Sequence, residues 1–321
     1  MPGELTVVAP DGVPEVVAGT DLAAVLLAAL EIELGADPVR DGDVLVVTSK
    51  IVSKAEGRVV RGERERWIDS ETVRLVARRG LTRIVRNRLG LIMAAAGIDA
   101  SNVAAGSVVL LPEDPDASAR ALRREVAERT GANIGVVVTD TAGRAWREGQ
   151  TDIAIGAAGL RVLESFAGRV DAHGNELAVT APAVADELAG AVELAQGKLG
   201  ARPCALVRGR ADLVLPREQD GPGAAALIRP EGADLFGYGA REAVVRAVGG
   251  RAEDRAPFGT AVEPVDLVDA LGRAGIEART GADGDVRCVP GRRAAVDIVA
   301  FAHGWTVVEE DTDLRLRPVT P

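Results

Sequence analysis

Patterns typical of β-strands and of α-helices alternate along this chain, and that alternation limits its possible folds more than any other feature. Apolar runs predict strands at VLVVT (44–48), RIVRN (83–87), SVVLLP (107–112), NIGVVVT (133–139) and CALVR (204–208). Helical patterns cover 22–34, 71–79, 115–129 and 184–196, most of them preceded by a capping residue or a proline. We therefore expect an α+β protein with mixed β-sheets and flanking helices.

The composition changes after about residue 240 of the chain. The segment GGRAEDRAPFGTAVEP (249–264) combines glycine, proline and mixed charge without periodicity, which predicts a linker. We divide the chain into a main domain over 1–245, a linker over 246–263 and a small α+β C-terminal appendage over 264–321. No internal repeat is apparent in the sequence.

The charge balance limits the class of partner. The chain has 38 basic and 48 acidic residues, a formal net charge of −10, so we expect neither nucleic acid nor a membrane as a partner. No signal peptide or membrane-spanning tract is recognisable, which predicts a cytoplasmic location. Cys204 and Cys288, like His173 and His303, lack the spacing of a disulfide framework or a zinc site. We expect Cys204 to be buried and inert and His173 to lie in a loop.

Hydroxyl and ammonium groups follow the strand at 44–48. Within VLVVTSKIVSKAEGR (44–58) we expect a loop that carries Ser49, Lys50, Ser53 and Lys54. Such groups can hold phosphate oxygens through charge-assisted hydrogen bonds. The alternative is a solvated edge loop that keeps a sheet soluble.

Both signs of charge follow the strand at 133–139. We expect Asp140 and Thr141 at its rigid end, where a carboxylate and a hydroxyl suit a hard divalent cation. Arg144 and Arg147 could receive an anionic substrate, although a structural ion-pair cluster explains the same residues equally well. We expect Trp146 to pack in the core rather than to stack on a ligand.

A third polar group follows the apolar part of NRLGLIMAAAGIDASNV (87–103). Asp99, Ser101 and Asn102 form a compact set of donors and acceptors, but they could equally form an Asx-turn or a helix cap. Neither a P-loop nor a GxGxxG motif is present, so a nucleotide site would have to be unconventional.

Seven stretches, taken in chain order, resemble the coenzyme F420-0:L-glutamate ligase family, also called F420:γ-glutamyl ligases. They are GVPEV (12–16), DGDVLVVTSKIVSKAEGR (41–58), NRLGLIMAAAGIDASNV (87–103), VVVTDTAGRAWREGQTDIAIGAAGL (136–160), GNELAVT with VADELA (174–189), GKLGARPCALVRG (197–209) and IRPEGADLF (228–236).

The resemblance implies an enzyme that uses GTP and Mg²⁺ or Mn²⁺ to join L-glutamate to coenzyme F420-0 through an acyl phosphate, and then to extend the tail through γ-linkages. In the family the nucleotide is held by the positions that match Val13, Pro14, Glu15, Val16, Ser49, Lys54 and Asn102. Two divalent cations are held by the positions that match Asp99, Asp140 and Thr141. We assign catalytic roles to Lys54, Asp140 and Arg144. The resemblance also implies a homodimer, and K⁺ is a further candidate ion.

Some features depart from the family. Fused actinobacterial relatives continue into a flavin-binding domain of about 200 residues, a size ordinary for one domain. The shorter tail here shows no likeness to it, so we expect no FMN. Lys198 lies where archaeal relatives can place a glutamine near the metals, and Ala181 lies where relatives often carry glutamate. Two alternatives remain: a related ligase with another acceptor or amino acid, and a non-catalytic nucleotide-binding homologue.

Overall fold

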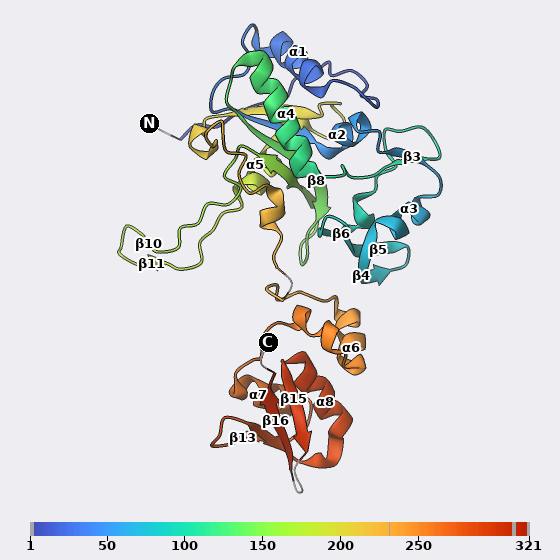
Figure 1. The fold of residues 1–321 in the computed structure, drawn as a ribbon, viewed down its shortest axis with the longest axis vertical. Coiled ribbons are helices and arrows are strands. Elements are labelled where there is room, and N and C mark those ends of the chain that lie inside the picture. Colours follow the sequence, from blue (N-terminus) through green and yellow to red (C-terminus); the bar gives the residue numbers. More distant parts are fainter. Residues whose placement is uncertain (1–2, 231, 310–312, 320–321) are drawn as a thin grey trace. The chain divides into compact units, whose positions relative to one another are not determined.

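The computed structural model describes residues 3–230, 232–309 and 313–319, which form two compact units (Figure 1). The first unit comprises the residues up to Leu75 together with Ile84–Ile228, and the second comprises Val76–Arg83 and the residues from Arg229 onward. The expected α+β architecture is confirmed. The division after Ile228 places α6 (Ala240–Gly249) in the second unit. The limits of the catalytic domain drawn from the sequence stay a prediction.

A mixed five-stranded sheet organises the first unit. Its order is β1 (Thr6–Val8), β12 (Cys204–Arg208), β2 (Val44–Thr48), β8 (Gly135–Gly143) and β9 (Gln150–Ala158). Only β2 and β8 run parallel; their neighbours pair antiparallel. Because Thr48 pairs with Thr139, the carboxyl ends of the two parallel strands meet at the same edge of the sheet.

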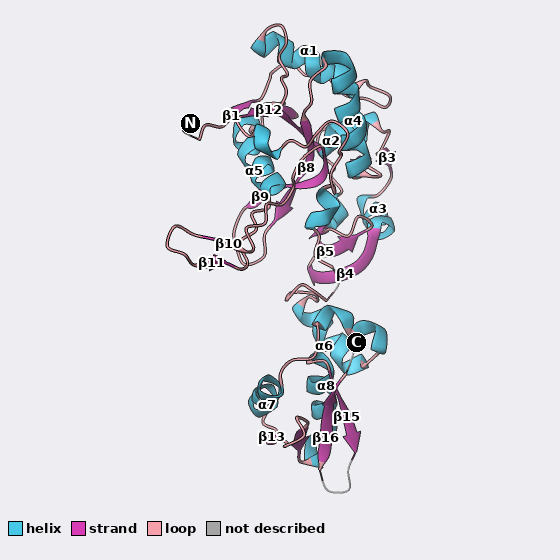
Figure 2. Ribbon diagram, turned by 60° about the vertical axis from the view of Figure 1, so that its left-hand side comes forward, coloured by secondary structure: helices cyan, strands magenta, loops and turns pink. Residues whose placement is uncertain are grey.

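Helices cover both faces of this sheet, which explains the unbroken apolar runs of its central strands. Leu45 and Val47 of β2 pack in one buried cluster with residues of α1 and α4, while Val44 and Val46 pack in a second cluster with α5. Figure 2 shows α4 and α5 on opposite sides of β8. The helices of the first unit are α1 (Leu22–Leu34), α2 (Ser49–Ala55), α3 (Arg64–Glu71), α4 (Pro115–Thr130) and α5 (Val184–Gln196).

Side-chain caps begin two of these helices, as expected from the capping residues that precede the helical patterns. The carboxylate of Asp21 accepts from the backbone N–H of Ala24, and that of Asp114 accepts from Ala117, as N-caps do. Helix α5 begins after Ala183 without a side-chain cap. None of the described helices is long and apolar enough to cross a membrane.

Three smaller sheets complete the region around the main sheet. They are β3 (Val59–Arg61) with β7 (Ser107–Val109), β4 (Thr72–Arg79) with β5 (Thr82–Asn87) and β6 (Ile92–Ala94), and β10 (Arg169–Val170) with β11 (Glu176–Leu177). The prediction of a helix over 71–79 is wrong, because these residues form β4. Their burial alternates with a period of two along most of the strand. The sequence mixes arginines with short apolar residues, so its pattern alone fits a helix as well as a strand.

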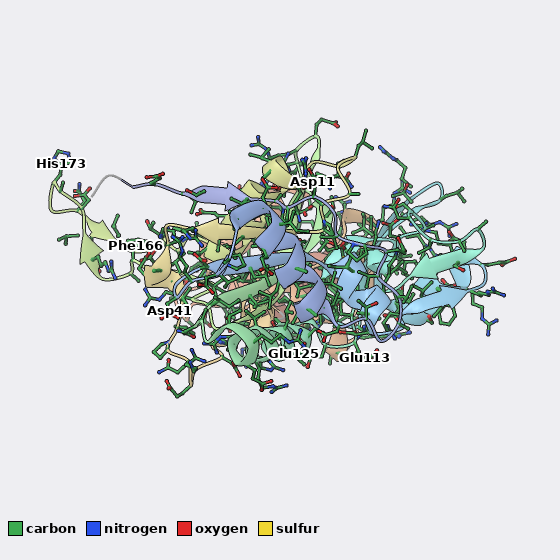
Figure 3. All side chains as sticks on the ribbon, turned by 90° about the horizontal axis from the view of Figure 1, so that it is seen from above. Asp11, Asp41, Glu113, Glu125, Phe166 and His173 are labelled. Carbon is green, nitrogen blue, oxygen red and sulfur yellow. The ribbon has the colours of Figure 1, made fainter. Side chains whose placement is uncertain are left out.

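The hairpin formed by β10 and β11 projects from the first unit (Figure 3). His173 lies at its tip, and its backbone N–H donates to the carboxylate of Asp171. The prediction that His173 is a loop residue is therefore confirmed.

The second unit is an antiparallel four-stranded sheet packed against helices. The strand order is β13 (Ala278–Thr280), β14 (Val286–Cys288), β16 (Leu314–Pro318) and β15 (Trp305–Glu309). Its core joins the strands to α7 (Pro264–Arg273) and α8 (Arg293–Ala302) through Leu267, Leu271, Val296 and Trp305. The appendage predicted over 264–321 is thus α+β, as expected. The predicted linker also contains ordered turns, at Ala252–Asp254 and Ala256–Phe258.

A helix followed by two strands occurs twice in this unit: β13 and β14 follow α7, and β15 and β16 follow α8. Both α7 and α8 are followed by a glycine of positive φ, Gly275 and Gly304. The inner strands pair about Arg287 and Arg315, and the segments DVRCVP (285–290) and DLRLRP (313–318) match in this register. Like charges directly opposite destabilise a strand pair; Asp283 offsets this, because it accepts from Arg315 at 2.9 Å and from Arg287 at 3.3 Å.

Candidate active site

Asp140 lies at the centre of the candidate site, on β8. The apolar run before it is buried, as predicted, but β8 continues past Asp140 to Gly143 instead of ending there. The pairing of β8 with β9 is irregular between Val138 and Thr139. Such bulges bend a strand and change the direction of its side chains, and they are common beside functional sites.

Helix α2 supplies the first partner of Asp140. The hydroxyl of Ser49 donates to Oδ1 of Asp140 at 3.1 Å. The prediction that residues 49–58 form a loop is wrong for its first seven residues, which form α2. The parallel pairing of β2 and β8 explains the contact, because it places the start of α2 beside the end of β8.

Asp99 reaches the same site from a distant part of the chain. Its Oδ2 forms an ion pair with Nζ of Lys50 at 2.6 Å, and its Oδ1 accepts from the backbone N–H of Ser101 at 2.7 Å, which is an Asx-turn. Burial acts to raise the pKa of Asp99, but the bonds from Lys50 and Ser101 outweigh it and lower that pKa overall. Lys50 and the backbone N–H of Ser101 therefore already stabilise the negative charge of Asp99.

Asp140 has the opposite electrostatic environment. Burial raises the pKa of Asp140 from 3.8 to about 7; bonds from Ser49 and from the backbone of Thr141 act against this, and the nearby charges of Asp152 and Asp99 add to it. Among the described residues, no lysine or arginine forms an ion pair with Asp140. Charges of acidic groups far apart in the sequence thus act on Asp140, which has no ion pair of its own among the described residues.

A second acidic cluster adjoins Asp140. The hydroxyl of Thr141 donates to Oδ1 of Asp152 at 2.7 Å. Burial raises the pKa of Glu193 and the hydrogen bond with Asp152 raises it further, whereas Lys198 acts to lower it. Lys198 pairs with Glu193 and lies 3.0 Å from Thr141 Oγ1.

Sequence reasoning missed Glu193. One signal was present: Glu193 lies in the last turn of α5, where the helix dipole favours a cation. Lysine usage is a second signal. The chain has only three lysines among 38 basic residues, Lys50, Lys54 and Lys198. Lys50 and Lys198 pair with acids of this site.

Lys54 connects α2 to the segment Val13–Val16. Its Nζ pairs with Oε1 of Glu15 at 2.6 Å. Its side chain is 8% exposed and that of Glu15 is 75% exposed, so this pair lies at the boundary between the core and solvent. Val16 is buried, whereas Pro14 is exposed. The structure thus brings this segment next to α2, and its role in nucleotide binding stays a prediction.

The remaining predicted residues are exposed. Arg144 lies in the turn between β8 and β9, where it donates to the carbonyl of Glu148 at 2.7 Å, and Arg147 follows in the same turn. Trp146 is 87% exposed, so the prediction that it packs in the core is wrong. Asn102 has a left-handed backbone with φ 56°. The predicted roles of Arg144 and Asn102 stay predictions.

The donor set suits a hard cation. The candidate ligands present carboxylate and hydroxyl oxygens, the groups that Mg²⁺ and Mn²⁺ prefer. The strongest fit is Asp140, a half-buried carboxyl that a bound cation would keep ionised. Within the described part of the chain, no set of three or more histidine, cysteine, aspartate or glutamate side chains is already gathered as a metal site.

Comparison with known proteins identifies the family. The profile of the F420-0:Gamma-glutamyl ligase family matches residues 12–209. A protein of Archaeoglobus fulgidus named coenzyme F420:L-glutamate ligase is 39% identical over 221 residues, which cover 62% of this chain and 85% of the relative. Proteins of the same name from Methanopyrus kandleri and Methanothermobacter thermautotrophicus are 38% and 35% identical, and the matches cover 68% and 72% of this chain and 92% and 98% of those relatives. The chain belongs to the F420-0:γ-glutamyl ligase family.

Proposed function

We propose that this chain ligates L-glutamate to coenzyme F420-0, with GTP as the energy source and Mg²⁺ or Mn²⁺ as the metal, and that it extends the tail through γ-linkages. Support comes from relatives that are named for glutamate ligation to coenzyme F420. The chain matches nearly the whole length of these relatives. It comes also from the residues of the candidate site. Residues 210–321 lie beyond the family match, and the proposal assigns them no part.

One arrangement carries the proposal: desolvation of the half-buried carboxyl of Asp140, together with the charges of Asp152 and Asp99, raises its pKa to about 7. A solvent-exposed carboxyl with only a structural role would not have its ionised form disfavoured in this way. A bound divalent cation would reverse the balance, since it favours the ionised form of each nearby carboxylate. We assign the metal to Asp140, Asp99 and Thr141.

The reaction needs an activated carboxylate, because a free carboxylate is a poor acylating agent. An oxygen of the coenzyme's carboxylate attacks the γ-phosphorus of GTP, and the bond to the bridging oxygen breaks to release GDP. The amine of glutamate then attacks the acyl carbon, loses a proton and displaces phosphate. The metal, when bound, supplies positive charge to the phosphate oxygens.

The protein's own groups orient these reactants. Ser49 holds the carboxyl of Asp140 in place from the start of α2. Lys54 carries an ammonium group at the end of a largely buried stem, where it can exchange its bond to Glu15 for one to a phosphate. Positioning of this kind supplies a large part of the acceleration in group transfer.

The test is a purified reaction containing GTP, Mn²⁺, L-glutamate and coenzyme F420-0, followed by mass spectrometry of the coenzyme and by GDP release. We expect a mass gain of one or more glutamate residues, with one GDP released for each. Asp140→Ala should lose turnover by at least about 100-fold, since changes even in outer metal partners cost 10–100-fold. Glu33→Gln, which alters an exposed carboxylate of α1, is the matched control and should keep full activity. No product from the wild-type chain would refute the proposal.

A further inference from the structure

Lys198 occupies a position that resembles a cation-binding site. Its Nζ lies 3.0 Å from Oγ1 of Thr141 and 3.6 Å from Oδ1 of Asp152, and it forms an ion pair with Glu193. These oxygens come from three separate elements, β8, β9 and α5. Because the proton of Thr141 is directed to Asp152, the free lone pairs of the hydroxyl face the ammonium group.

Position 198 carries a lysine where the chain almost always uses arginine. The chain uses arginine for all but three of its 38 basic residues, and the side chain of Lys198 is 63% exposed, so an arginine would have room. A guanidinium is a planar fork, whereas an ammonium is a compact point charge. A compact charge can lie among a hydroxyl and two carboxylates much as a metal ion does, whereas a guanidinium directs its donors in a fixed plane.

Asp140 marks a second cation position beside the first. It accepts from Ser49 and has acidic neighbours, of which Asp152 faces Lys198 and Asp99 pairs with Lys50. The site as a whole holds four carboxylates (Asp99, Asp140, Asp152 and Glu193) and two ammonium groups (Lys50 and Lys198). With all groups ionised, two negative charges remain, and a single divalent cation neutralises them.

We propose that Lys198 is a built-in cation that fills one of the two positions, so that the chain binds one divalent ion, at Asp140, where the family resemblance implies two. The inference rests on the proposed metal dependence of the enzyme. Lys198 thereby acts as a positioning residue: it holds Thr141 and Asp152 in the arrangement that a second metal would otherwise impose.

The experiment counts bound Mn²⁺ in the nucleotide-free chain by the electron paramagnetic resonance signal of the free ion. We expect one ion per chain for the wild type and two for Lys198→Gln, which removes the ammonium and keeps the oxygen ligands. Adding Glu193→Gln to that variant should return the count to one. Arg202→Gln is the matched control, since it removes a charge that pairs with the exposed Asp11, and it should leave the count at one.

The outcomes separate this inference from the proposed function. Two ions in the wild type, or one in Lys198→Gln, would overturn the role of Lys198 and leave the metal dependence standing. No Mn²⁺ bound to any variant would overturn the metal site itself. Circular dichroism of each variant accompanies the count, and two ions in the wild type overturn the inference even if a variant fails to fold.

Discussion

Asp140→Asn should stabilise the metal-free first unit, even though it removes a residue we place at the centre of catalysis. The native structure holds the pKa of Asp140 at about 7 mainly through burial, against an ordinary value of 3.8. At 1.36 kcal/mol for each pH unit between the two pKa values, the ionised carboxylate costs the native state up to about 4 kcal/mol. Asparagine keeps an acceptor for Ser49 and carries no charge, so it removes this cost.

The size of the effect depends on pH. Below about pH 4 the carboxyl is protonated in both states and contributes nothing. Between about pH 4 and pH 7 the unfolded chain releases this proton while the native chain retains it, so native stability falls as pH rises. Above pH 7 the full cost remains. The advantage of Asp140→Asn should therefore grow from near zero at pH 4 to its largest value at pH 8.

Hydrogen exchange measured by mass spectrometry, in chelator and at several pH values, gives the opening free energy of peptides from β8. Peptides from α7 and α8 belong to the second unit and serve as an internal control. Saturating Mn²⁺ should reverse the order, because a ligand that binds only the native wild type stabilises only the wild type. Equal protection of β8 in both proteins at pH 8 without metal would refute the reasoning.

Three further outcomes follow from the contacts. Lys54→Ala should weaken binding of GDP by about 10- to 100-fold, the range for a lost hydrogen bond to a charged group, in a calorimetric titration where Glu33→Gln binds normally. Arg123→Met should lower the free energy of unfolding by about 3–5 kcal/mol in urea, because the buried guanidinium of Arg123 pairs with Asp220 and also donates to several carbonyl groups; a loss below 1 kcal/mol would contradict this. Cys204 should resist iodoacetamide at pH 8 until the chain is unfolded, since burial raises the pKa of its thiol to about 12, and rapid native labelling would disprove that.

The sequence was sufficient to predict β2, β8 and β12 of the main sheet, but not β1 and β9, because strands covered on both faces must be apolar throughout. VLVVT and GVVVT have this property, and they form β2 and β8. The same argument correctly placed Asp140 on a rigid element next to a buried run. Local patterns failed where a segment is short. Residues 49–55 make only two turns of helix and contain two serines, a composition that fits a loop as well as α2.

Tertiary packing decided the parts of the site that the sequence did not reveal. Glu193 reaches Asp152 because α5 packs on β9, and no local pattern states which helix covers which strand. Asp99 meets Lys50 because an isolated bridge between Asp99 and Val109 fixes the turn that follows it. Both contacts join residues more than forty positions apart, so their prediction requires the pairing of whole elements.

Lysine usage supplies the information that local patterns lack. Arginine supplies nearly all the positive charge of this chain. We therefore interpret each lysine as a position where the shape of the cationic group matters as well as its charge. Lys54 is largely buried, where a guanidinium would need partners for five donors, and Lys198 faces a hydroxyl and two carboxylates that suit a compact cation. The three lysines come from two distant segments, yet each neutralises an acid at or beside the candidate site. Replacing each with arginine would keep the net charge and change only the shape of the group, so a loss of metal or nucleotide binding in those variants would show that the site depends on geometry.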